Sequence, residues 1–569
     1  MNQDISLHKE ITNEKLLSLT LQGKLSNLKE PITKVRLTAV FSDGKQSRRF
    51  PIVSSLYPDG EQYYFSGNAS ISMKDVFLYG TQEDMVSVVI EVAYGTQSIS
   101  YEAQKFSLEG RFFQRKSRKH HVLYSVYNFL ISILSVLLLP VMILDGYVAQ
   151  RGYKELDLGE KRATGLKAIL FHANHKILKF TGFTFSVRQR KTDYFEAKYR
   201  KYAKKPCKEN QVLFLSERRV EDNSNLSRIQ ERLSQEQGIS VVEFLNEKTV
   251  DKLSYKEIRK AAKLVAGSKL VVLEDFYPQL HPLDIRPETK IVQLWHACGA
   301  FKTFGFSRLG KRGGVDQDSR NHRSYDYVFV SGKKVEPIYS EAFAIPEENV
   351  KALGVPRTDI FFDDSYREQK KTELYTKYPQ LKGKKVVLFA PTFRGDGNKD
   401  AYYPMEQFSI EACMEALPEN IMLIIKHHPF VKETMSIPKQ CEDRVLDFSK
   451  TEQINDLLFL TDVLITDYSS SIFEAALLDI PMVFYAFDKE EYMQDRDIYG
   501  DFDAFVPGDI VMTQKELPTS IMRAMENGKE SNEKMEVFQE QYLSALDGNS
   551  TNRIGEYMIQ LLFGNIKFI

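Results

Sequence analysis

Cysteine is scarce in this sequence. The 569 residues include only four cysteines, which are Cys207, Cys298, Cys413 and Cys441. They are widely spaced, and no Cys-x-x-Cys pair occurs. This spacing argues against a disulfide framework and against a zinc site built on paired cysteines, and it fits a reducing compartment.

Net charge and several familiar motifs are also missing. The 77 basic residues balance 77 acidic ones, so no global field favours a nucleic-acid partner. The first ten residues are polar and charged, unlike a signal peptide, so export is not expected. Neither G-x-x-x-x-G-K-[ST] nor a strand-linked G-x-G-x-x-G occurs, which argues against kinases, ATPases and dehydrogenases. No H-E-x-x-H pattern is present either, so we expect no structural metal.

A stretch of short alternating strands comes first along the chain. Between residues 17 and 113, strands such as 34–41 and 85–93 are separated by turn signals such as the Asp-Gly pair at 59–60. This pattern predicts a β-sandwich module of roughly 100 residues, which we place at residues 1–116. Because it has no cluster of histidines, cysteines or paired carboxylates, a scaffold or interaction role is expected.

The composition then changes to basic and apolar. A basic run ends at Lys119, and residues 122–144 carry no formal charge over 23 positions, enough to span a bilayer. Tyrosines, serines and a proline dilute this run, and the positive-inside tendency would place the rest of the chain outside the cell. Apolar residues alternate with cations over 166–205, as in helices that lie on anionic lipid. We therefore expect a membrane-contacting helical linker over residues 117–205; the alternative is a pair of buried helices between domains.

From Gln211 onward, short apolar strands alternate with helical or loop segments. This alternation predicts βαβ units and parallel sheets, and hence an α/β fold. The expected strands are 212–215, 241–245, 270–273, 291–294 and 327–330 in a first series, and 386–390, 421–425, 463–466 and 482–485 in a second. Two Rossmann-like halves, assigned to 206–345 and 346–569, would leave a ligand cleft at the carboxyl ends of their strands.

Polar clusters follow several of these strands. In the first half, the run Trp295-His296-Ala297-Cys298-Gly299 comes directly after a strand, and Lys302 lies close behind it. A histidine beside glycine and lysine suits a general base next to a phosphate-holding loop, because imidazole titrates near neutral pH. The alternative for His296 is a hydrogen-bonded loop histidine without a catalytic role.

In the second half, the strand ends carry cations, hydroxyls and imidazoles. They include Pro391-Thr392-Phe393-Arg394, Lys426-His427-His428 and Ser469-Ser470-Ser471, and Arg357 lies on the connection between the halves. Such groups at one sheet edge suit a nucleotide diphosphate. Read alone, the three serines would be an ordinary cap of the helix that begins at Ile472.

Six ordered motifs resemble the CDP-glycerol glycerophosphotransferase family of teichoic acid synthesis. They lie at 295–314, 354–359, 390–394, 426–430, 466–470 and 485–508, within a resemblance that covers residues 210–545. Within the family, residues 299–308 and 321–325 are most similar to ribitol-phosphate polymerases, which use CDP-ribitol. Glycerol-phosphate polymerases more often carry Gly-Thr-Pro-Leu-Lys after the Trp-His pair.

The resemblance implies a GT-B-like pair of domains and a reaction at the cytoplasmic face of the membrane, with the protein bound peripherally. Ribitol phosphate would move from CDP-ribitol to a teichoic acid on a polyprenyl diphosphate lipid, and CMP would leave. His296 corresponds to the general base, and we expect His428 to stabilise phosphate charge. The expected donor-binding residues are Trp295, Ala297, Cys298, Gly299, Arg357, Pro391, Thr392, Lys426, His427, Ser469, Ser470 and Glu474.

Several alternatives stay open at this point. Glu474 lies where the glycerol enzymes carry aspartate, and its carboxylate could hold a ribose hydroxyl or position the donor. Ala297 and Cys298, in place of Gly-Thr, could reshape the polyol pocket. A CDP-glycerol-dependent primase or polymerase, a nucleotide-sugar glycosyltransferase of the same fold and an inactive membrane scaffold are the rival functions. Assistance by Mg²⁺, the oligomeric state and the partner of the β-module are left open.

Overall fold

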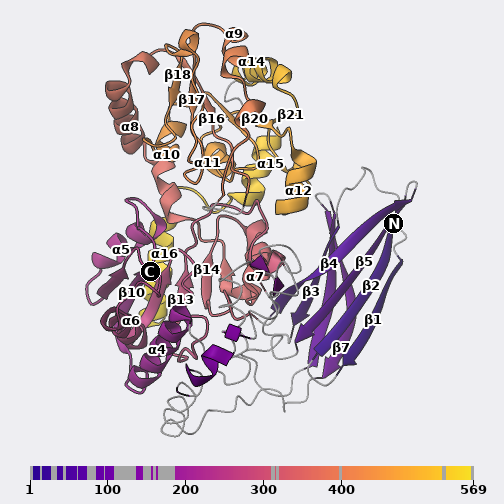
Figure 1. Ribbon diagram of the computed structural model, residues 1–569, viewed down its shortest axis with the longest axis vertical. Coiled ribbons are helices and arrows are strands. Elements are labelled where there is room, and N and C mark those ends of the chain that lie inside the picture. Colours follow the sequence, from indigo (N-terminus) through magenta and orange to yellow (C-terminus); the bar gives the residue numbers. More distant parts are fainter. Residues whose placement is uncertain are drawn as a thin grey trace.

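Two α/β domains are stacked along the long axis of the molecule, and a β-rich module lies beside the first of them (Figure 1). The structure is a computed structural model. It describes residues 186–308, 314–315, 319–395, 400–527 and 533–564, seven strands between residues 4 and 107, and a few residues between 133 and 173.

Seven antiparallel strands form the N-terminal module, in the order β1-β2-β5-β4-β3-β6-β7. They are β1 (Asp4–Thr12), β2 (Leu16–Ser26), β3 (Val35–Ser42), β4 (Ser47–Asp59), β5 (Gln62–Ser72), β6 (Met85–Tyr94) and β7 (Gln97–Ser107), followed by the short pair β8 (Leu156–Asp157) and β9 (Arg162–Ala163). The predicted β-rich module is confirmed. The first half of β4 pairs with β3 and its second half pairs with β5, so β4 connects the seven strands into one order.

The predicted linker, residues 117–205, lies largely outside the described residues. Its last part is α4 (Val187–Tyr202), which packs against α6 (Tyr255–Gly267). Phe195 and Tyr199 of α4 are buried in the core of the first α/β domain. This cation-rich segment therefore belongs to that domain, although its charge pattern suggested a helix on lipid. Among the described residues, no helix has both the length and the apolar character needed to cross a membrane.

The first α/β domain contains a parallel sheet in the order β11-β10-β12-β13-β14-β15. Its elements are β10 (Lys208–Ser216), α5 (Asn225–Ser234), β11 (Ser240–Leu245), α6, β12 (Ser268–Leu273), β13 (Lys290–Gln293), β14 (Tyr327–Phe329), α7 (Glu336–Phe343) and β15 (Val350–Lys351). Along β10, Val212 and Phe214 pack on one face, and Leu213 and Leu215 on the other. Both faces are therefore covered, which explains the uninterrupted apolar run in the sequence.

The second sheet has the order β18-β17-β16-β19-β20-β21. Its strands are β16 (Lys385–Phe389), β17 (Ile421–Ile425), β18 (Val445–Asp447), β19 (Val463–Thr466), β20 (Met482–Tyr485) and β21 (Asp509–Val511). Its helices are α8 (Asp364–Lys377), α9 (Ile410–Glu415), α10 (Ile454–Leu458), α11 (Ile472–Leu477), α12 (Lys489–Arg496), α13 (Phe502–Phe505), α14 (Leu517–Asn527) and α15 (Glu533–Tyr542). The strand order reverses between β16 and β19, and ligands of doubly wound sheets bind at that point.

The last helix returns to the first domain. Figure 1 shows α16 (Ser550–Phe563) among the elements of that domain, where it packs against α5 and β10. The carboxylate of Asp359 accepts hydrogen bonds from the backbone N–H groups of Ser550 at 3.0 Å and Thr551 at 2.8 Å, which anchors the start of α16. The predicted boundary between the two domains lay between residues 345 and 346. In the structure, β15 and α16, which both come after that boundary, belong to the first domain.

Candidate active site

The loop that follows β13 lies between the two domains. Gly299 has a φ of 65°, and a Cβ there would lie 2.3 Å from the ring of Phe473 on α11, so only glycine fits. Phe301 stacks on Phe505 with 4.9 Å between ring centroids. Cys298 is buried, which raises the pKa of its thiol, and Ala297 packs against the same core. The structure thus places this predicted donor-contacting stretch in the packing between the domains.

His296 points one ring nitrogen at a carboxylate. Its Nδ1 lies 2.9 Å from Oδ1 of Asp275, and 48% of its side chain is exposed. Burial raises the pKa of Asp275, but the hydrogen bond with His296 and the charges of His296 and Arg218 together lower it overall. Because a carboxylate only accepts, Nδ1 carries the proton and Nε2 is left as an acceptor. The sequence analysis missed Asp275, although its place two residues after β12 was a signal of the same kind as that of His296.

Asn225 joins three parts of the site. Its Nδ2 donates to the carbonyl oxygen of Trp295 at 2.7 Å, and its Oδ1 accepts from the backbone N–H of Arg357 at 2.8 Å. Trp295 has a φ of 55°, and its ring stacks on that of His296 at 4.5 Å. Asn225, at the start of α5, therefore fixes the backbone on both sides of the cleft. In the sequence it resembled any residue at the start of a helix.

Lys302 reaches from the first domain to the second. Its Nζ donates to Oγ1 of Thr392, which follows β16, at 2.9 Å. The ammonium also lies 5.5 Å from the ring centroid of Tyr492. Burial lowers the pKa of Lys302 to about 7, although the nearby carboxylate of Asp467 favours the charged form. Lys302 was not among the site residues predicted from the sequence, because its partner Thr392 comes from a distant segment.

His428 lies beside this lysine. Burial, and then the charge of Lys302, lower the pKa of the His428 imidazole to about 4. Its Nδ1 accepts a hydrogen bond from the backbone N–H of Phe430 at 3.2 Å. The neutral ring therefore carries its proton on Nε2, which can donate to a phosphate oxygen.

A buried ion network supports Thr392. Oδ1 of Asp467 accepts from the backbone N–H of Thr392 at 2.7 Å, and Oδ2 accepts from Arg394 at 2.7 Å. Arg394 also pairs with Asp488 through Nε at 2.8 Å. These charges are satisfied by one another, so their role is to hold the strand ends, and Pro391 is buried in the same region.

Arg357 and Glu474 form a buried ion pair. Only 18% of the Arg357 side chain and 5% of the Glu474 side chain are exposed. The structure therefore brings these two predicted donor ligands together and directs their charges at each other. The partner of the Glu474 carboxylate, which the sequence could not identify, is therefore Arg357.

The structure does not bring Lys426 and His427 to the Lys302 cluster. Nζ of Lys426 donates to the carbonyl oxygens of Phe448 at 3.0 Å and Ser449 at 3.2 Å. His427 is 1% exposed and packs near the ring of Tyr403, 5.4 Å between centroids, and within the described residues neither of its ring nitrogens has a partner. Burial lowers the pKa of His427 to about 4. The ring of His427 thus packs near Tyr403, whereas the ring of His428 lies near Phe393 and Phe430.

The serine turn before α11 bonds within itself. Oγ of Ser469 accepts from the backbone N–H of Ser471 at 3.3 Å and from its hydroxyl at 3.0 Å. Ser471 is the N-cap residue but makes no capping bond through its side chain, and Ser470 is exposed. The side-chain capping bond expected from the alternative interpretation, an ordinary helix cap, is therefore not formed, and α11 is only six residues long.

Metal ligands were not expected from the sequence. In the parts of the chain that the structure describes, no three or more His, Cys, Asp or Glu side chains are grouped so that they could hold a metal ion.

Comparison with known proteins identifies relatives over most of both α/β domains. The chain is 40% identical over 374 residues to the teichoic acid poly(ribitol-phosphate) polymerase of Bacillus spizizenii, a match that covers 66% of this chain and 60% of that protein. It is 39% identical over 364 residues to the ribitol-phosphate polymerase TarL of Staphylococcus aureus, covering 63% of each. The chain thus spans less than two thirds of these two relatives. The teichoic acid glycerol-phosphate primase of Bacillus subtilis is 30% identical over 307 residues, covering 53% of this chain and 76% of that one.

The fold has a solved counterpart. A structure of the wall teichoic acid polymerase TagF superposes with a TM-score of 0.53 at 17% identity, covering 67% of this chain and 95% of the other. The GT-B-like arrangement of the two sheets is thereby confirmed. Residues 197–560 match one protein family, which is well over half of the chain. The chain belongs to the CDP-glycerol:poly(glycerophosphate) glycerophosphotransferase family.

Proposed function

We propose that this chain transfers a polyol phosphate from a CDP-polyol to a teichoic acid carried on a polyprenyl diphosphate lipid. One observation carries the proposal. Lys302 of the first domain donates a hydrogen bond to Thr392 of the second, and its charge acts on His428, beside the point where the order of the second sheet reverses. A cation, a hydroxyl and an imidazole N–H in one cleft are the groups that bind a diphosphate.

The proposed chemistry is an in-line phosphoryl transfer. The terminal hydroxyl oxygen of the acceptor forms a bond to the β-phosphorus of the donor, and the bond from that phosphorus to the bridging oxygen breaks, so CMP leaves with the electron pair. Nε2 of His296 takes the hydroxyl proton, and Asp275 stabilises the imidazolium. Lys302 and Nε2–H of His428 offset the phosphate charge, since such transfers depend mainly on placement and countercharge.

The remaining predicted residues have supporting roles in this proposal. Thr392, Ser469 and Ser470 supply hydroxyls that could bond the donor, because they lie directly after β16 and β19. The Arg357–Glu474 pair holds the connection between the domains against α11.

We propose ribitol phosphate as the transferred group. The ribitol-phosphate polymerases are 39% to 40% identical to this chain, whereas the glycerol-phosphate primase of Bacillus subtilis is 30% identical. Since Cys298 is buried, its difference from the glycerol enzymes would act through packing. Transfer from CDP-glycerol is the second candidate, favoured by the name of the family.

The donor is tested by measuring CMP release with a lipid-linked acceptor. CDP-ribitol, CDP-glycerol and a UDP-sugar are supplied in turn at equal concentration. The proposal predicts the highest kcat/KM with CDP-ribitol and no turnover of the UDP-sugar. A higher kcat/KM with CDP-glycerol would select the second candidate, and turnover of the UDP-sugar alone would overturn both.

We also propose that the protein binds peripherally to the cytoplasmic face of the membrane, where its lipid-linked acceptor would be found. Leu137 and Leu144, within the apolar run 122–144, are 69% and 62% exposed. Exposed leucines that follow a basic run suit a segment lying in an anionic lipid surface.

A further inference from the structure

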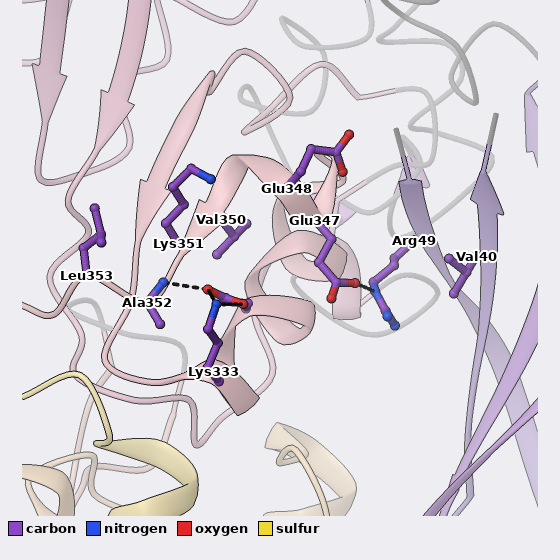
Figure 2. Close-up of a pocket in the computed structure, with 10 residues that line it drawn as sticks. Val40, Arg49, Lys333, Glu347, Glu348, Val350, Lys351, Ala352 and Leu353 are labelled. Atoms are coloured by element: carbon purple, nitrogen blue, oxygen red, sulfur yellow. Dashed lines mark hydrogen bonds and ion pairs between the residues drawn. The ribbon is translucent and has the colours of Figure 1, made fainter. Parts of the chain in front are cut away.

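The N-terminal module contacts the first α/β domain through two arginines on neighbouring strands. Figure 2 shows Arg49, on β4, facing Glu347 beside α7, and the Nε–Oε2 distance is 2.6 Å. A cavity of about 540 Å³ lies next to this pair. Its lining carries three basic and three acidic side chains, two of which, Lys333 and Glu336, pair at 3.1 Å, so its formal charges balance.

The second arginine, Arg36 on β3, binds a buried carboxylate. Arg36 pairs with Oε1 of Glu341 on α7, and the hydroxyl of Thr38 donates to Oε2 at 2.7 Å. From the opposite side, the hydroxyl of Ser307 donates to Oε1 at 2.7 Å. Only 7% of the Glu341 side chain is exposed, so this carboxylate depends on its three donors. Two of them come from the β-module and one comes from the loop that follows His296.

Arg36 reaches the same loop by a second route. Its guanidinium lies 4.6 Å from the ring centroid of Tyr499. The backbone N–H of Tyr499 donates to the carbonyl oxygen of Phe301 at 2.9 Å, and its hydroxyl accepts from the backbone N–H of Phe304 at 3.4 Å. These two contacts lie on either side of Lys302.

We propose that the N-terminal β-module positions the 301–308 loop, and with it Lys302, through Glu341 and Tyr499. Arg36 is then a positioning residue for the transfer reaction. Its kinetic test, the kcat/KM for CDP-ribitol, rests on the proposed function, whereas its structural test, amide hydrogen exchange, does not. A shift of about 1 Å in a catalytic group can lower turnover about a hundredfold, so small relaxations of this loop matter.

The chain offers a matched control for Arg36. Arg36→Ala removes an ion pair that leads to the loop. Arg49→Ala removes an ion pair with Glu347 at the same interface and one with Glu91 within the module, and both carboxylates lie outside the loop. For Arg36→Ala we expect kcat/KM for CDP-ribitol to fall at least about tenfold. Arg36→Lys, which keeps the charge near Glu341, should recover part of this loss. Arg49→Ala should stay within about twofold of the wild-type kcat/KM, because its partners Glu91 and Glu347 lie outside the 301–308 loop. Equal losses in the two alanine variants would overturn the proposal, as would no loss in Arg36→Ala.

A double-mutant cycle and hydrogen exchange separate positioning from general destabilisation. Ser307→Ala acts on Glu341 from the loop side and is a mild change should Arg36→Ala fold poorly. The loss of kcat/KM in the double variant Arg36→Ala/Ser307→Ala should be smaller than the two single-variant losses combined, because both substitutions act through the carboxylate of Glu341. Amide exchange in the 301–308 peptide of the full chain should rise in Arg36→Ala and not in Arg49→Ala. Unchanged exchange would overturn positioning whatever the activity. If exchange rises in Arg36→Ala but the wild-type protein turns over no CDP-polyol, only the proposed function is overturned.

Discussion

His296 and His428 differ in what their ring nitrogens contact, and this difference supports the different roles proposed for them. His296 is held by a carboxylate and leaves Nε2 free to take a proton. His428 is held by a backbone N–H, and its lowered pKa keeps it neutral, so it offers a proton in a hydrogen bond. The geometry thus directs one imidazole by a carboxylate and the other by a backbone N–H.

Lys302 predicts a pH dependence of donor binding. Because burial lowers its pKa to about 7, Lys302 loses its proton in the empty enzyme as the pH rises above that value. A bound diphosphate favours the charged ammonium, so binding takes up a proton above pH 7. The Kd for CDP-ribitol should therefore rise with pH by up to about tenfold per unit.

Calorimetric titration between pH 6 and 9 measures this dependence. Lys302→Arg keeps its charge throughout the range and should give a flatter profile, whereas Lys302→Met should bind weakly at every pH. If the wild type and Lys302→Arg show the same profile, Lys302 is not the group that titrates.

At single positions, the sequence predicted residue types better than partners. It selected His296 and His428 from their places after strands and grouped His427 with them, because adjacent letters do not show that the rings of His427 and His428 have different neighbours. It did not select Asp275 or Lys302, whose roles depend on contacts made only in the folded chain.

At the scale of elements, the nine predicted α/β strands are confirmed, because buried parallel strands leave long apolar runs in the sequence. The edge strands β15, β18 and β21 were not predicted, since two or three residues carry no periodic pattern. The serines before α11 were predicted to bind the donor, with an ordinary helix cap as the alternative. Hydroxyls can bond to neighbouring serines as readily as to a helix end, and the sequence cannot distinguish these choices.

The apolar run 122–144 is predicted to contact the membrane. Replacing Leu137 and Leu144 together by glutamate should reduce flotation of the full chain with vesicles that contain anionic lipid, because charge there opposes insertion into the lipid surface. Val537→Glu on α15 is the control, since Val537 is also exposed, at 45%, but lies outside this run. Undiminished flotation of the leucine variant would remove this run from the membrane contact.

At the scale of the whole molecule, the cleft depends on long-range connections that sequence patterns do not reveal. The α16 helix returns to the first domain and is anchored by Asp359, nearly two hundred residues earlier. Arg36 of the β-module meets Glu341, about three hundred residues later. The sequence therefore predicted the two sheets and the β-rich module, but not how they hold one another.

The most direct test of the account is single-turnover CMP release from CDP-ribitol in the presence of a lipid-linked acceptor. Wild-type protein should release one CMP for each ribitol phosphate transferred. His296→Ala should slow this step about 10² to 10⁴-fold, the range contributed by a general base, with little change in the Kd for CDP-ribitol. Release by His296→Ala at nearly the wild-type rate would contradict the account.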